Sequence, residues 1–211
     1  MAIAHVNTGA KSTTYNGTSV SLALPASIVA GNLLVGFVAT RPSGAISWPA
    51  GWTVVDSQST AGSTSSTSIA YRIADGSETA PSVTYGSGTA MGGILQFSGA
   101  SGINARQKNT STSAGENVAA FTSAGDGSVS AYFWSGFNGA GETHMPTPSG
   151  WTRVVAFMTG DVYSTYFNFD VGIKTLGGAG SSSGAISENS GYGYWSLFNI
   201  EITAATVAEG T

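Results

Sequence analysis

Apolar and polar side chains alternate over short stretches of this chain. Between residues 67 and 74, Ile69, Tyr71 and Ile73 alternate with smaller or polar residues. A period of two is typical of a β-strand with one buried face. The pattern therefore predicts a strand over 67–74.

Similar runs, rich in Val, Ile, Thr and aromatic residues and bounded by Gly, Pro, Asn, Asp and Ser, occur throughout the chain. Helical spacing is nearly missing, and the best candidate, 24–30, contains Pro25 and precedes Gly31, which leaves room for one turn at most. Asn16-Gly17 favours a tight hairpin turn between the first two strands. We expect strands at 3–8, 19–24, 32–40, 51–57, 67–74, 83–85 and 91–97, and then at 117–122, 128–136, 150–159, 163–173 and 192–203.

One phrase of the sequence occurs twice. Pro49-Ala50-Gly51-Trp52-Thr53 returns as Pro148-Ser149-Gly150-Trp151-Thr152. The flanking apolar runs match in the same order: 31–38 with 127–134, 68–73 with 164–169 at the same spacing, and 93–97 with 195–200. The sequence thus predicts two related halves, about 19–99 and 117–203. A polar connection over 100–116 joins them, in which 103–109 could add an edge strand.

Strand spacing and the repeat together predict the fold class. About a dozen short strands with frequent turns are typical of an all-β sandwich. Each half alone supplies only a modest core. We therefore expect an all-β protein, a jelly-roll-like two-sheet β-sandwich made of two related halves, with residues 1–211 forming a single domain.

The composition narrows the classes of partner. Only 9% of the residues are charged, against roughly 25% in typical proteins, while 41% are hydrophobic, which argues against disorder. Seven Lys and Arg are scattered and the net charge is −4, so we expect no nucleic acid as a partner. No apolar run is long enough for a membrane span. The chain has no cysteine and starts without a basic, apolar leader, so we expect synthesis in the cytoplasm without a signal peptide.

Candidate chemistry is sparse. His5 and His144 are the only histidines, and there is neither a Gly-x-Ser-x-Gly elbow nor an Asp-x-Asp-x-Asp calcium pattern. We expect no enzyme activity, no catalytic residue, no cofactor and no metal site. Asp56, Asp126 and Asp161 lie near expected strand ends, so a carboxylate pair brought together by the fold stays open as an alternative.

The tryptophans divide into repeated and unrepeated positions. Trp52 and Trp151 recur at equivalent places, so we expect both to plug an end of the sandwich core, with a sugar-binding platform as the alternative. Trp48 has no counterpart, because Thr147 stands at its place in the second copy. It is a candidate surface contact for a glycan or a protein partner, together with His144, Tyr163 and Tyr192.

A resemblance to a known family rests on four segments of the first half. They are Leu24-Pro25-Ala26 with Ala30-Gly31-Asn32-Leu33-Leu34, then Pro49-Ala50-Gly51-Trp52-Thr53-Val54-Val55, Ala70-Tyr71-Arg72-Ile73-Ala74 and Gly92-Gly93-Ile94-Leu95-Gln96-Phe97-Ser98-Gly99. This series resembles β-sandwich domains of bacteriophage virion proteins and of bacterial surface proteins with phage-like origin. The resemblance covers about 20–100, and it reaches the second half through the weaker repeat.

The resemblance implies a non-enzymatic structural protein on the exterior of a phage virion, either a capsid decoration or a head-fibre protein. We expect the protein to differ from tail fibres in having neither a long fibrous stalk nor a separate N-terminal anchoring domain. Expected partners are other virion proteins and further copies of the chain. The alternative is a glycan-binding adhesion module, of tail-fibre or receptor-binding type, that attaches the particle to host polysaccharide.

Overall fold

The computed structural model of the protein describes residues 2–60, 64–111, 115–138, 144–160, 166–188 and 194–205, and within them it contains strands and no helix. The all-β prediction is therefore confirmed. The strands are β1 (Ala4–Thr8), β2 (Ser12–Ser21), β3 (Leu33–Arg41), β4 (Thr53–Ser59), β5 (Ser66–Ile73), β6 (Ser82–Ser98), β7 (Ala100–Ser111), β8 (Glu116–Val118), β9 (Val129–Asn138), β10 (Thr152–Gly160), β11 (Tyr166–Thr175), β12 (Ile186–Glu188) and β13 (Tyr194–Ala204).

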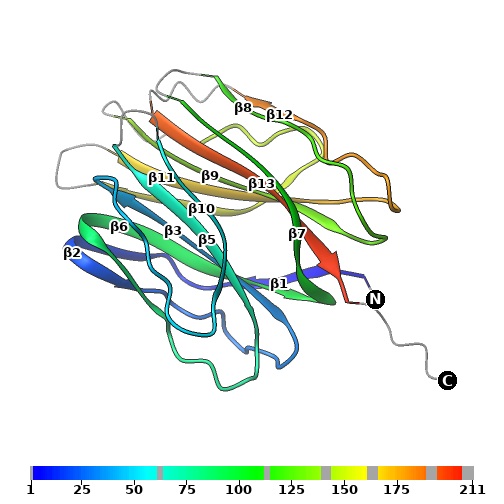
Figure 1. Ribbon diagram of the computed structural model, residues 1–211, viewed down its shortest axis with the longest axis horizontal. Coiled ribbons are helices and arrows are strands. Elements are labelled where there is room, and N and C mark those ends of the chain that lie inside the picture. The colour runs from blue at the N-terminus through cyan, green and yellow to red at the C-terminus, as the bar shows by residue number, and fades with distance from the viewer. Residues whose placement is uncertain are drawn as a thin grey trace.

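Two antiparallel sheets form a sandwich, which confirms the predicted two-sheet architecture (Figure 1). The first sheet has the order β1-β6-β3-β5-β4, with β2 also paired to β6, and the second has the order β10-β11-β9-β13-β7. The short pair β8–β12 lies above the second sheet (Figure 1). All strands of the first sheet precede those of the second in the chain, so the chain crosses from one to the other once, between β6 and β7. The strands therefore do not alternate between sheets as they do in a jelly roll.

The two sheets repeat one strand order. Starting at β1 and β2, the first sheet continues with β6, β3, β5 and β4; starting at β7, the second continues with β13, β9, β11 and β10. Strands β3, β4, β5 and β6 thus correspond to β9, β10, β11 and β13. The two sheets therefore have the same design. The polar connection is mostly strand, since β7 forms the edge of the second sheet.

Register fixes which residues correspond. Phe37 lies opposite Ile69 in the first sheet, and Phe133 lies opposite Val171 in the second. Ile69 therefore corresponds to Val171, and 66–73 corresponds to 168–175. The predicted match of 68–73 with 164–169 is wrong by six residues. A fixed spacing fails here because the second half has three more residues between Phe133 and its copy of the doubled phrase than the first half has after Phe37. Its β10–β11 hairpin is also three residues longer than the β4–β5 hairpin.

The doubled phrase makes the same turn twice. The Trp52 amide donates to the Pro49 carbonyl over 3.3 Å, and the Trp151 amide donates to the Pro148 carbonyl over 3.1 Å. The glycines before these tryptophans have φ of 86° and 82°, which side chains other than glycine rarely adopt. Both following strands then carry a bulge at the same place, between Val54 and Asp56 and between Arg153 and Val155.

The Asn16-Gly17 prediction is wrong. These residues lie within β2, where the register with β6 shifts between Thr14 and Gly17, and Asn16 has a φ of 50°. A dipeptide that tolerates positive φ suits a bulge as well as a hairpin, and the long partner β6 runs past it without turning. The predicted strands at 83–85 and 91–97 are accordingly one strand.

Apolar residues form three clusters, one between the sheets and one on each outer face. The middle cluster includes Phe37, Phe133 and Phe169, all fully buried. Trp52 packs on the outer face of the first sheet and Trp151 on that of the second. The prediction that these tryptophans plug an end of the sandwich core is therefore wrong, because both lie on the outer faces of the sheets.

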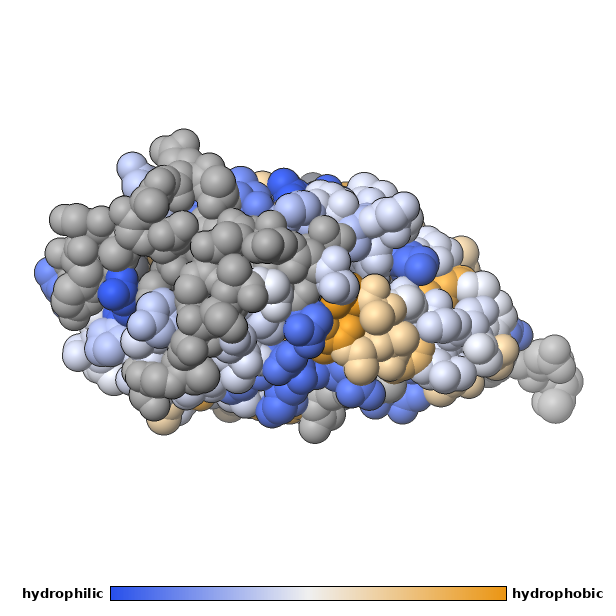
Figure 2. All heavy atoms as spheres, turned by 90° about the horizontal axis from the view of Figure 1, so that it is seen from above, coloured by the Kyte–Doolittle hydropathy of each residue, from blue (hydrophilic) through white to orange (hydrophobic). Residues whose placement is uncertain are grey.

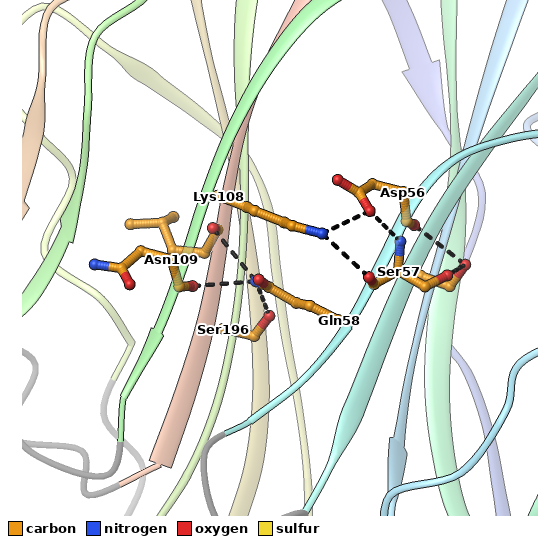
Figure 3. Close-up of polar contacts among 8 residues, drawn as sticks. Asp56, Ser57, Gln58, Lys108, Asn109 and Ser196 are labelled. Atoms are coloured by element: carbon orange, nitrogen blue, oxygen red, sulfur yellow. Dashed lines mark hydrogen bonds and ion pairs between the residues drawn. The ribbon is translucent and has the colours of Figure 1, made fainter.

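Side chains tie the edges of one sheet to the edges of the other. Lys108 of β7 pairs with Asp56 of β4 at 2.8 Å, and the Gln58 amide donates to Ser196 and to the Asn109 carbonyl beside it (Figure 3). At the opposite edge, Lys11 donates to the Met158 carbonyl, and Tyr15 bonds Thr159. Strands β4 and β7 thus face each other at one side, and β2 and β10 at the other.

Candidate functional site

A pocket of about 360 Å³ opens beside β4, on the outer face of the first sheet. We call it the β4 pocket. Its walls are the segment 44–46, which crosses this face, and the polar residues of β4 and β5: Ser57, Gln58, Ser59 and Ser66. Its volume lies within the range of pockets that hold small molecules.

Two rungs of paired serines build the wall of the β4 pocket. Ser57 lies opposite Ser68 and Ser59 opposite Ser66, with hydroxyl oxygens 2.8 and 2.9 Å apart. Ser57 and Ser59 are exposed, while Ser66 and Ser68 are buried. Ser66 also accepts a hydrogen bond from the Gly44 amide at 3.1 Å, which joins the crossing segment to the sheet. Small hydroxyl residues on adjacent strands thus give a fixed polar surface.

Trp48 lies behind this surface. Its indole Nε1 donates to the Ser68 hydroxyl over 2.9 Å, and its ring lies 5.2 Å from that of Trp52. A Cβ on Gly36 would lie 2.7 Å from the indole, so glycine is required beneath it. The side chain is half-buried. The structure therefore places this sequence candidate in the packing of the outer face, one hydrogen bond away from the β4 pocket.

His144 lies at a second polar site, on the outer face of the second sheet. Its Nδ1 is 2.9 Å from the Asp170 carboxylate, which is fully buried on β11. The same carboxylate accepts from the Met145 amide at 2.8 Å and lies 3.7 Å from the Arg153 Nε. These contacts offset the cost of burying a charge.

Sequence reasoning missed Asp170, because 26 positions separate it from His144. The signal was a single carboxylate inside the apolar run Phe167-Asn168-Phe169-Asp170-Val171. A charged residue in such a run is rarely buried without a partner. The other two candidates, Tyr163 and Tyr192, lie outside the described residues.

Tyr132 belongs to the same site. Burial raises the pKa of its hydroxyl to about 12, and the negative charge of Asp170 adds to this shift, while Arg153 and Thr147 act in the opposite direction. The phenol is therefore neutral over the physiological range. Its ring lies 5.3 Å from that of Trp151, so it fills space on the second sheet as Trp48 does on the first.

The two sites occupy corresponding places. Aligned on the doubled phrase, Ala45 corresponds to His144, and the strand registers match Ser68 with Asp170 and Ser66 with Asn168. The first half has small hydroxyl residues and an open pocket at this place. The second half has a buried carboxylate with a histidine and an arginine.

The remaining carboxylates of interest have structural partners. Asp56 pairs with Lys108, and Asp126 accepts from the Ala179 amide at 2.7 Å; Asp161 lies outside the described residues. Across the described part of the chain, no three His, Asp or Glu side chains come together as a metal site. The same residues include no helix long and apolar enough to cross a membrane.

Comparison with protein-family models, curated proteins and solved structures finds no match to this chain.

Proposed function

We propose that the protein is a non-enzymatic structural protein on the exterior of a bacteriophage virion, a capsid decoration or head-fibre protein. The observation that carries this proposal is the closed sandwich with tied edges and few charges. Lys108 and Gln58 join β4 to the second sheet, and Tyr15 and Lys11 join β2 to it. The chain has no cysteine, so its fold does not depend on disulfides or on an oxidising compartment.

The surface supports packing against other subunits. In Figure 2, most of the described residues on the face over the second sheet have intermediate hydropathy (white to pale colours), and a small hydrophobic patch lies beside a hydrophilic strip. Only 9% of the chain is charged. Weakly charged surface costs little to desolvate when a neighbouring subunit covers it. Other virion proteins and further copies of the chain are the partners of such a surface.

Purified protein added to particles that lack it tests this proposal. Binding should saturate at a fixed number of copies per particle, as measured by sedimentation and quantitative gel densitometry. Particles that already carry the protein should take up none. Binding that does not saturate, or that is equal on both kinds of particle, contradicts the proposal.

The second candidate function is a glycan-binding adhesion module. The β4 pocket favours it, because Ser57, Ser59 and Ser66 present hydroxyl groups at a concave surface. A glycan array carrying host polysaccharides tests it: specific retention supports adhesion, and an array without hits contradicts it.

A further inference from the structure

We propose that the β4 pocket binds a neutral, hydroxyl-rich ligand the size of one sugar residue, and that only the first half of the chain carries this site. The inference rests on the second candidate function and names its ligand class. It is independent of attachment to a particle.

The lining of the pocket selects hydroxyl groups. The Ser57 hydroxyl donates to Ser68 and can still accept, while in the bonded pair Ser59 and Ser66 one hydroxyl keeps its hydrogen to donate. The backbone of 44–46 adds further polar groups. Paired donors and acceptors are what a sugar hydroxyl, itself both donor and acceptor, requires. Ile46 contributes an apolar surface for the C–H face of a ring.

The charge of the site disfavours ionic ligands. None of its lining residues is charged. Asp56, next to Ser57 in the chain, pairs with Lys108 at 2.8 Å (Figure 3). A carboxylate or ammonium group on the ligand would therefore lose hydration without gaining a partner.

The wall is held in place before any ligand arrives. Ser59 and Ser66 bond each other, and Ser66 also accepts from the Gly44 amide. Behind them, Ser68 accepts from both Ser57 and Trp48. Binding therefore costs little ordering of side chains, which favours affinity for a small ligand.

The second half carries different residues at the corresponding place. His144 stands where the first half has Ala45, and Asn168 stands where it has Ser66. His144 is held there by Asp170 at 2.9 Å. The residues that open the pocket are thus among those in which the two halves differ. The second half supplies the substitution that should close it.

Titration by heteronuclear NMR tests the inference. The probes are the methyl glycosides of glucose, galactose and mannose, with glucuronate and glucosamine as charged counterparts. At least one neutral glycoside should shift the amide signals of Ser57, Ser59 and Ser66, with a dissociation constant on the order of 1 mM. The charged sugars should bind at least tenfold more weakly.

The matched variants are Ala45→His, which introduces the residue of the second half, and Ala50→His, the same change at an exposed position outside the lining. Ala45→His should weaken glycoside binding at least tenfold, and Ala50→His should leave it unchanged. Both variants should keep the melting temperature of the wild-type protein and its binding to particles. The inference is overturned if no neutral glycoside binds up to about 20 mM, if charged sugars bind equally well, or if the two variants behave alike. If the wild-type protein binds a neutral glycoside but does not bind particles, only the virion proposal is contradicted.

Discussion

Phe37 and Phe133 hold the same place in the two halves and face each other across the sandwich, with ring centroids 5.9 Å apart. Equivalent residues meet in this way when two like sheets pack about a local twofold axis. The edges agree with this arrangement, because β2 faces β10 while β4 faces β7. The two halves of the chain thus pack against each other as the two subunits of a symmetric dimer would.

Replacing Phe37 by Ala should lower the free energy of unfolding by about 3–5 kcal/mol. Its ring also stacks on Phe169 at 4.3 Å and lies 6.0 Å from Phe157, so its loss leaves a cavity between the sheets. Urea unfolding followed by fluorescence measures the change. Val6→Ala, at a side chain that is 46% exposed, is the control and should change stability by less than about 0.5 kcal/mol.

Trp48 and Ser68 should be energetically coupled. Trp48→Phe removes the donor to Ser68 and should cost about 1 kcal/mol. In a double-mutant cycle with Ser68→Ala, the coupling energy should be about 0.5–1 kcal/mol. A coupling energy of zero would show that the indole N–H contributes nothing here, and would contradict the position assigned to Trp48.

Asp170→Ser, which installs the residue of the first half, should destabilise the fold by about 3 kcal/mol. It removes the carboxylate that His144, Arg153 and the Met145 amide contact. Ser68→Ala, at the corresponding position, should cost only about 1 kcal/mol. Equal losses in thermal and chemical denaturation would mean that the carboxylate is not the organising group of this site.

Stability should fall at alkaline pH because of Tyr132. Its pKa of about 12 in the folded state lies above the ordinary value of about 10, so the unfolded chain loses this proton first. The contribution is fully present below about pH 10 and is lost as the pH rises toward about 12. A shift of about 2 units corresponds to about 2.7 kcal/mol.

Urea unfolding between pH 8 and about 12, for wild-type protein and Tyr132→Phe, isolates this effect. The variant should show a smaller decline over the range. Parallel pH profiles would contradict the assignment. Tyr71→Phe is a suitable control, because the Tyr71 side chain is only partly buried.

The candidate site could be predicted from the sequence only in part. Sequence difference between the halves pointed to Trp48 and His144 as unrepeated residues, and both lie at or beside polar sites in the structure. The partners of these residues, Ser68 on β5 and Asp170 on β11, were not predictable, because both lie far along the chain from the residue that they contact. The paired serines of the pocket wall could not be predicted either, since alternate serines on two strands lie opposite each other only in one register.

Sequence patterns were enough to predict most of the strands, the repeated halves and the two-sheet sandwich. These follow from local patterns: alternation of side chains, turn residues, and one phrase used twice. The three-dimensional structure was needed to show that each half is one sheet, that Asn16-Gly17 lies in a bulge, and that Trp52 and Trp151 cover outer faces. Strand pairing and register join residues far apart in the chain, and connections of unequal length shift that register, so no local pattern fixes which side chains meet.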